Sequence, residues 1–145
     1  MLSILITLSA FPGFLGFGPN PSLLDVTNRF GNPITLGQSD DKRIQSFTYA
    51  RESYLLKAIS DKNSQVLTLQ AYGLNKSVKY RGVRLMSDFK SVIKKLGNPQ
   101  KYFFDDKGFD MRYPDCVFTL VKLGRKSYHQ VVCIEVNMKP GTHII

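Results

Sequence analysis

The sequence has few of the residues on which enzyme and metal chemistry depends. Its 145 residues include two histidines, two cysteines and no tryptophan. Two cysteines are too few for a disulfide-rich secreted scaffold or for a four-ligand zinc site. No phosphate-binding loop, dinucleotide-binding fingerprint or zinc motif occurs. We therefore expect a protein that is not an enzyme and that uses no cofactor and no metal.

The titratable residues that remain have ordinary structural explanations. His129 falls in a predicted strand, opposite Leu120, and His143 lies close to the end of the sequence. The adjacent pairs Asp40-Asp41 and Asp105-Asp106 fall in predicted turns, where aspartate side chains satisfy nearby backbone groups. Turn formation is the expected role of these pairs, and a metal site is the alternative.

Long apolar runs are also absent. Residues 1–17 carry no charged side chain, but residues 2–8 are too short to span a membrane. A signal peptide would need a basic start and small residues before the cleavage point. We expect a strand or short helix packed on the core, a cytoplasmic protein and no integral membrane insertion. The alternative is a degenerate signal, which would make the protein secreted or periplasmic.

The charge is concentrated in one half of the chain. The net charge is +9. Residues 1–75 contain six Lys or Arg and five Asp or Glu, which gives +1, whereas residues 76–145 contain fourteen and six, which gives +8. Such an imbalance concerns partners and solubility rather than fold. It suggests an acidic protein, a nucleic acid or an anionic membrane surface as the partner.

The chain contains an internal repeat. Gly31-Asn32-Pro33 recurs as Gly97-Asn98-Pro99, an offset of 66, and after a one-residue slip residues 65–71 align with residues 130–136 at an offset of 65. Three ordered blocks at a nearly constant offset indicate duplication. We predict a first unit, residues 1–75, with an apolar N-terminal segment, and a second, basic unit, residues 76–145.

Each unit is predicted to begin with a helix. Apolar residues recur at i, i+3, i+4 and i+7 in both units, which defines one face of a helix. They are Leu23, Val26, Thr27 and Phe30, and then Phe89, Val92, Ile93 and Leu96. Asn20-Pro21 and Ser87-Asp88 are the expected helix starts. Gly31 and Gly97 are the expected ends, each followed two residues later by proline.

Antiparallel strands are predicted after each helix. Residues 102–104 and 109–113 form a hairpin around a turn at residues 105–108, and Phe47 and Tyr49 alternate in the same way in the first unit. Each unit is then one helix followed by three or four strands. The expected fold class is α+β, in which two tandem units form one sheet with both helices packed on one face.

The two cysteines are predicted to be neighbours on adjacent strands. Gly124-Arg125 resembles a two-residue hairpin turn between residues 116–123 and 126–136. Counting outward from this turn places Cys116 directly opposite Cys133. Reduced neighbouring thiols and a cross-strand disulfide are both consistent with this register, and a redox role is a third alternative.

The helix motif resembles a known family. In the SmpA/OmlA (BamE-type) outer-membrane assembly lipoproteins, a "G-M-T-x-x-x-V-x-x-x-x-G" helix leads into a small antiparallel sheet, and the tandem form resembles the β-lactamase inhibitor proteins. The matching stretches here are residues 20–31 and 86–97. The family's first glycine is replaced by Asn20 and Met86, and the lipid-anchored cysteine and the inhibitors' disulfide pattern are missing. The resemblance implies a non-catalytic binding protein whose sheet presents a concave face.

Basic residues supply the candidate binding site. They lead into the second predicted helix and cover the side of it that faces away from its apolar stripe. This basic surface consists of Lys76, Lys79, Arg81, Arg84, Lys90, Lys94 and Lys95. The first hypothesis is a protein-binding module, of the inhibitor or immunity type, that binds an acidic partner. The alternatives are a nucleic-acid-binding protein, an envelope or scaffold component, and a homodimer formed through exposed edge strands.

Overall fold

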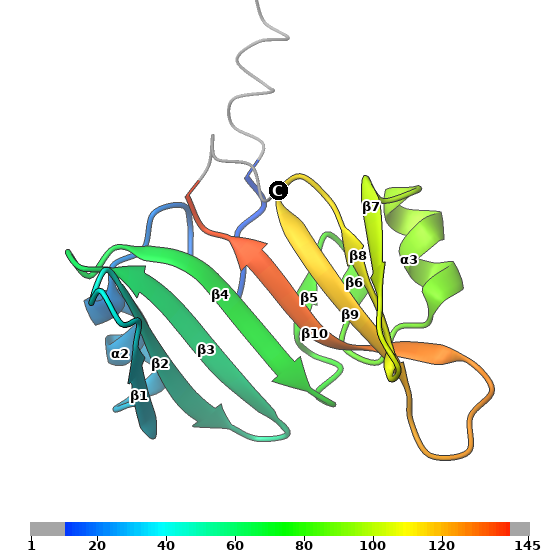
Figure 1. Ribbon diagram of the computed structural model, residues 1–145, viewed down its shortest axis with the longest axis horizontal. Coiled ribbons are helices and arrows are strands. Elements are labelled where there is room, and N and C mark those ends of the chain that lie inside the picture. Colours follow the sequence, from blue (N-terminus) through cyan, green and yellow to red (C-terminus); the bar gives the residue numbers. More distant parts are fainter. Residues whose placement is uncertain (1–10, 140–145) are drawn as a thin grey trace, which may run out of the picture.

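The computed structural model describes residues 11–139, which form one curved antiparallel sheet with two short helices (Figure 1). The eight strands are ordered β1-β2-β3-β4-β10-β9-β8-β7. Strands β5 and β6 form a separate two-stranded hairpin. Residues 2–8, the apolar run expected to pack on the core, lie outside the described residues.

The elements follow one another in the order helix, four strands, small hairpin, helix and four strands. The helices are α2 (Leu23–Phe30) and α3 (Phe89–Leu96). The strands before α3 are β1 (Thr35–Gln38), β2 (Ile44–Arg51), β3 (Tyr54–Asp61), β4 (Val66–Gly73), β5 (Lys79–Tyr80) and β6 (Val83–Arg84). The strands after α3 are β7 (Lys101–Phe104), β8 (Gly108–Arg112), β9 (Cys116–Lys122) and β10 (His129–Asn137).

The predicted fold class is wrong. Instead of two α+β units, the structure is mainly β, with 48% of the described residues in strands and 12% in helices. Both helices are only eight residues long. In both helices the helical repeat of apolar residues lasts for only two turns. Each helix therefore covers a small part of the sheet, and the two do not form a second layer. The strands pair continuously across β4 and β10, and this pairing is called the central seam below.

The first helix begins at a different residue from the one predicted, whereas the second begins within the predicted Ser87-Asp88 start. Ser22, rather than Asn20, caps α2: its hydroxyl accepts the backbone N–H of Asp25, whose carboxylate accepts the N–H of Ser22 in return. Asp88 caps α3 by accepting the N–H of Ser91. Asn20 instead has a positive φ of 56°. Asparagine tolerates this left-handed backbone better than most residues, which explains its place just before the helix.

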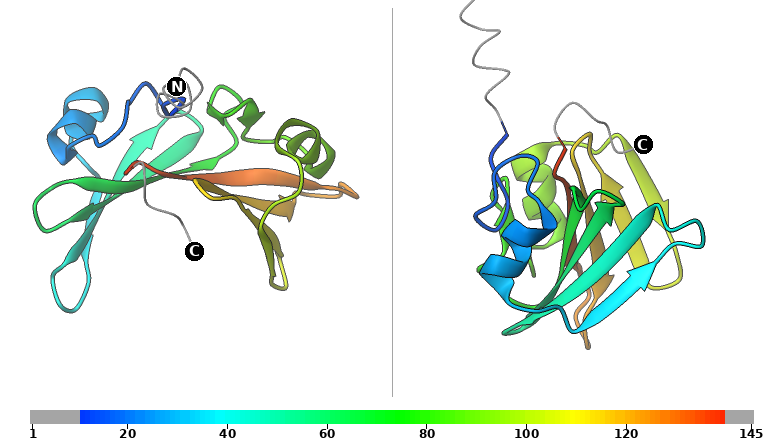
Figure 2. Two further views of the ribbon diagram at one scale, coloured as in Figure 1. Left: turned by 90° about the horizontal axis from the view of Figure 1, so that it is seen from above. Right: turned by 90° about the vertical axis from the view of Figure 1, so that its left-hand side faces the viewer.

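The helix ends and the buried helix positions are as predicted. Gly31 and Gly97 follow the two helices with φ of 80° and 74° and ψ near −165°. This backbone conformation is essentially restricted to glycine. Val26 and Val92 are both completely buried. They belong to the core between the helices and the sheet, which both helices approach from the same side (Figure 2).

The other face of the sheet is open. Figure 2 shows that the two ends of the sheet bend away from the helices, so the open face is concave. Its side chains are mixed in character. Register places Lys57, Gln70, Tyr72, Glu135 and Thr119 on this face, because their neighbours along each strand are the buried core residues. Residues 11–139 contain no helix that is long and apolar enough to cross a membrane.

Candidate functional site

The basic surface is built from the β5–β6 hairpin and helix α3. Arg81 and Gly82 form the hairpin turn, and both have positive φ, as a type I′ turn requires. The ammonium group of Lys95 donates a hydrogen bond of 2.5 Å to the carbonyl of Gly82. This bond ties the last turn of α3 to the hairpin, so the hairpin and the helix present their charges from a fixed framework.

Arg81 anchors the hairpin to the sheet. Its guanidinium pairs with the carboxylate of Asp115 at 2.9 Å, and the Tyr80 hydroxyl donates to the same carboxylate at 2.6 Å. Burial, followed by the nearby Asp115, raises the pKa of Tyr80 well above its usual value. Arg84 in turn donates to the carbonyl of Lys76 at 3.3 Å. The Arg81, Arg84 and Lys95 side chains therefore hold the framework together.

The remaining four lysines of the basic surface point to solvent. Lys76, Lys79, Lys90 and Lys94 are all exposed. Within residues 11–139 their ammonium groups form no hydrogen bond and no ion pair. Lys90 lies near the Asp88 carboxylate, whose pKa is lowered mainly by the backbone N–H of Ser91 and slightly by Lys90. These four positive charges are thus available to a partner.

The two thiols are not neighbours, so the predicted register is wrong. His129 pairs with Lys122, which makes the connection six residues long, and Cys116 lies opposite Val136. Cys133 pairs with Thr119 beyond a bulge and faces the open side of the sheet, whereas Cys116 is buried on the helix side. Both are free thiols. Burial raises the pKa of both, that of Cys133 to about 12, so neither thiol is ionised near neutral pH.

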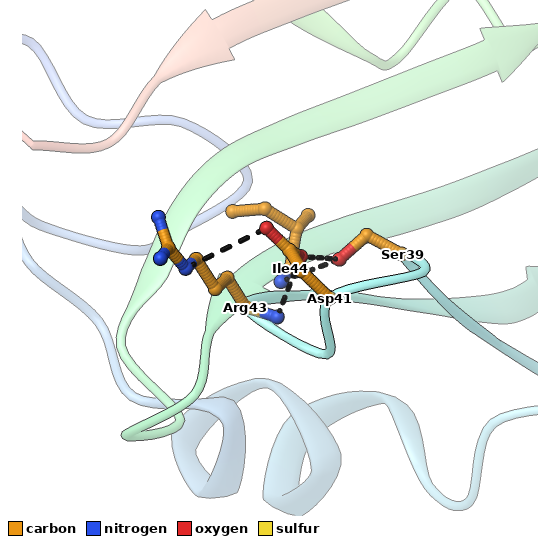
Figure 3. Close-up of polar contacts among 4 residues, drawn as sticks. All are labelled: Ser39, Asp41, Arg43 and Ile44. Atoms are coloured by element: carbon orange, nitrogen blue, oxygen red, sulfur yellow. Dashed lines mark hydrogen bonds and ion pairs between the residues drawn. The ribbon is translucent and has the colours of Figure 1, made fainter.

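The aspartate pairs belong to turns, as expected. Asp105 accepts the backbone N–H groups of Lys107 and Gly108, which lowers the pKa of its carboxyl group. Asp41 accepts the backbone N–H of Arg43 at 3.1 Å and the Ser39 hydroxyl at 2.8 Å (Figure 3). Within the described residues, no three His, Cys, Asp or Glu side chains gather in an arrangement that could hold a metal ion.

A groove on the helix side of the sheet, beside α3, was not predicted from the sequence. Its volume is about 660 Å³. We call it the aromatic groove. It is lined by Asp88, Phe89, Lys90, Tyr102, Phe104, Phe109, Ser127, Tyr128 and His129. The strand alternation of the aromatic residues predicted the β7–β8 hairpin correctly. The groove also needs the six-residue connection at 123–128, in place of the predicted two-residue turn.

Comparison with known proteins relates this chain to others by fold alone. No family model and no curated protein matches it. A cysteine-rich secretory protein from Staphylococcus aureus superposes with a TM-score of 0.61 at 11% identity, over 88% of this chain and 47% of that one. An extracellular protein with an SCP domain from Bacillus anthracis gives 0.56 at 12% identity, over 91% and 47%. This chain therefore spans about half the length of both structures.

A third solved structure is similar over most of its length. It is a DUF4309 family protein from Bacillus subtilis, with a TM-score of 0.52 at 17% identity, covering 85% of this chain and 84% of that one. Identities this low describe a shared fold and carry no activity from one protein to another. The resemblance to the SmpA/OmlA lipoproteins and the β-lactamase inhibitor proteins stays a prediction.

Proposed function

We propose that this chain is a non-catalytic protein-binding module that docks an acidic partner, as inhibitors and immunity proteins do. The observation that carries the proposal is that the cations of the basic surface fall into two groups, one bonded within the structure and one exposed. Arg81, Arg84 and Lys95 are engaged inside the framework, whereas the other four cations are exposed and unpaired within the described residues. Charges of this kind accelerate association and make it depend on salt.

The lysines of α3 are not needed for folding. The apolar stripe of α3 faces the core, where Val92 is fully buried, whereas Lys90 and Lys94 are exposed on the other side of the helix. At the equivalent positions α2 has Leu24 and Asn28, both exposed. A short exposed helix accepts glutamine as readily as lysine. The lysines are therefore better explained by a partner than by the stability of the helix.

Affinity capture from the native host, followed by kinetics on the captured partner, tests the proposal. We expect Lys90/Lys94→Gln to slow association at low salt and to weaken its salt dependence. Lys42/Lys62→Gln is the matched control, because it removes two exposed charges from the other half of the chain. It should leave the association rate nearly unchanged. Equal rates for both variants would contradict the proposal.

Retention on DNA or heparin examines the competing nucleic-acid hypothesis with the same variants. A protein that neutralises several phosphates loses affinity steeply as salt rises. Under the proposal, binding to DNA is weak at physiological salt and shows no preference for sequence. Tight, steeply salt-dependent binding to DNA, lost in Lys90/Lys94→Gln, would favour nucleic acid over an acidic protein.

A further inference from the structure

The aromatic groove lies where three elements meet. Helix α3 contributes Phe89, the β7–β8 hairpin contributes Tyr102, Phe104 and Phe109, and the 123–128 connection with the start of β10 contributes Tyr128 and His129. The side chain of Asp88, at the start of α3, is occupied in capping the helix. Because the walls come from regular elements on two sides, the groove has a defined shape.

The rings of the groove form one connected cluster. The Phe109 ring lies at its centre, 5.7 Å from Phe89, 5.6 Å from Phe104 and 5.1 Å from His129, measured between ring centroids. Tyr102 stacks on Phe104 at 5.9 Å. Edge-to-face and offset contacts of this kind stabilise ring clusters beyond the area they bury. The floor of the groove is thus a continuous apolar surface.

Three of these aromatic side chains are exposed to solvent. Phe104 is 75% exposed, Tyr128 47% and Phe89 36%. Single exposed apolar residues are common, but a contiguous group that lines a concavity is typical of an interaction site. The stability of the fold does not explain this exposed aromatic group, because an exposed phenylalanine contributes little to the stability of the monomer.

The corresponding connection between β3 and β4 builds no aromatic wall. Residues 61–65 form a tight turn, in which the Asp61 carboxylate accepts the backbone N–H groups of Asn63 and Gln65. None of these five residues is aromatic. The longer connection between β9 and β10, with Tyr128 at its end, is therefore a particular feature of the half of the sheet that carries the positive charge.

Cations lie beside the aromatic groove on α3, at the end of β9 and on the 123–128 connection. Lys90 lines it, and Lys122 pairs with His129 across β9 and β10, so its side chain leaves the same face of the sheet. Lys126 lies over the Tyr128 ring at 5.6 Å, and Arg125 is exposed beside it. The one carboxylate in the lining, Asp88, accepts the backbone N–H of Ser91 in α3. An apolar floor with cations along α3 and the 123–128 connection is complementary to an apolar anchor within an acidic sequence.

We propose that the aromatic groove binds a segment of the partner that is acidic and carries an aromatic anchor residue. The inference rests on the proposed function and names the part of the partner that is recognised. The anchor ring packs against Phe104 and Phe109, and flanking Asp or Glu side chains approach Lys90 and Lys126. Tightly packed aromatic anchors of this type dominate the binding energy of many interfaces.

Selection from a random peptide library on the whole protein tests this inference. We expect the enriched peptides to share an aromatic residue flanked by Asp or Glu. Phe104→Ser should weaken their binding by about tenfold or more. Leu36→Ser is the matched control, because Leu36 is 70% exposed on the opposite edge strand. Tyr128→Ser provides a second groove variant at a position that contributes nothing to the core.

Affinity can be measured without labelling, because the chain contains no tryptophan. A selected peptide whose anchor is tryptophan is then the only indole in the sample, and its emission shifts to shorter wavelength when the ring is buried. Failure to enrich any peptide, enrichment without acidic residues, or equal binding by wild type and Phe104→Ser would each overturn the inference.

The two proposals can fail separately. If the captured partner depends on Lys90 and Lys94 but binds Phe104→Ser normally, the docking function stands and the aromatic groove is not its site. If neither the Lys90/Lys94→Gln pair nor Phe104→Ser affects the captured partner, both proposals are wrong. Loss of partner and peptide binding in Phe104→Ser, with normal binding in Leu36→Ser, supports the inference.

Discussion

Gln70 and Glu135 lie directly opposite each other on β4 and β10, and the Gln70 side-chain amide donates a hydrogen bond to the Glu135 carboxylate. They are also the residues that the sequence alignment superimposes at an offset of 65. The bond therefore crosses the middle of the central seam, where the strands that follow α2 meet those that follow α3. It lies on the open, concave face, halfway along the eight-stranded sheet.

Removal of this bond should weaken the central seam. We expect Gln70→Ala to lower the free energy of unfolding by about 1–3 kcal/mol, because it leaves a half-buried carboxylate without its donor. Gln38→Ala, at an exposed position on the edge strand β1, should have an effect within about 0.5 kcal/mol. Urea denaturation of both variants measures the difference. Equal stabilities would show that water replaces the bond without cost.

The buried valines of the two helices should be equally sensitive. Val92→Ala and Val26→Ala are each expected to cost about 1–3 kcal/mol, through lost burial and a residual cavity. Both side chains are fully buried. Leu24→Ala is the control within α2, since Leu24 is 66% exposed. Thermal or chemical denaturation should give similar free energies of unfolding for the two valine variants, and a value close to that of the wild type for Leu24→Ala.

Two neighbouring cations of the β5–β6 hairpin should behave differently. We expect Arg81→Gln to destabilise the protein by about 0.5–1.5 kcal/mol, because it breaks the charge-assisted contact with Asp115, which is partly screened by solvent. Lys79→Gln should change stability by less than about 0.5 kcal/mol. The order of the two effects should be reversed in association kinetics: Lys79→Gln should slow association with the partner more than Arg81→Gln does. If both variants unfolded alike, Arg81 would not be an anchor.

The thiol of Cys133 should ionise only in strongly alkaline solution. In a Cys116→Ala variant, the rate of alkylation should keep rising with pH toward about 12, whereas an ordinary thiol levels off above a pKa of about 8.5. Because the unfolded thiol loses its proton first, the stability of the fold should decline as pH rises from about 8.5 toward 12. Cys133→Ser should remove that part of the decline. Levelling of the rate near pH 9 would contradict the prediction.

Local patterns explain the parts of the fold that the sequence analysis predicted correctly. The spacing of apolar residues around Val26 and Val92 predicted both helices, since two turns are long enough to define a face. Gly31 and Gly97 marked the helix ends because few other residues adopt the backbone found there. The 105–108 turn was predicted by its aspartates, and the hairpin around it pairs Phe104 with Phe109.

Non-local effects explain the errors. Gly124 does have a positive φ, but it lies inside a six-residue connection, because Lys122 is the last residue of β9 to find a partner in β10. The bulge between Val131 and Cys133 then shifts the register further. A shift of this kind moves side chains to the other face of a sheet, which separated the thiols. The aromatic groove depended on the same connection and was missed for the same reason.

The central seam also has a consequence during synthesis on the ribosome. Strand β4 pairs with β3 within a few residues, but its other edge finds its partner only when residues 133–137 of β10 have emerged. At about 5–20 residues per second, the nascent chain carries that unpaired edge for several seconds. An unpaired edge is a template for other chains. Substitutions that delay β10 should therefore reduce the yield of folded protein more than they reduce its stability once it is made.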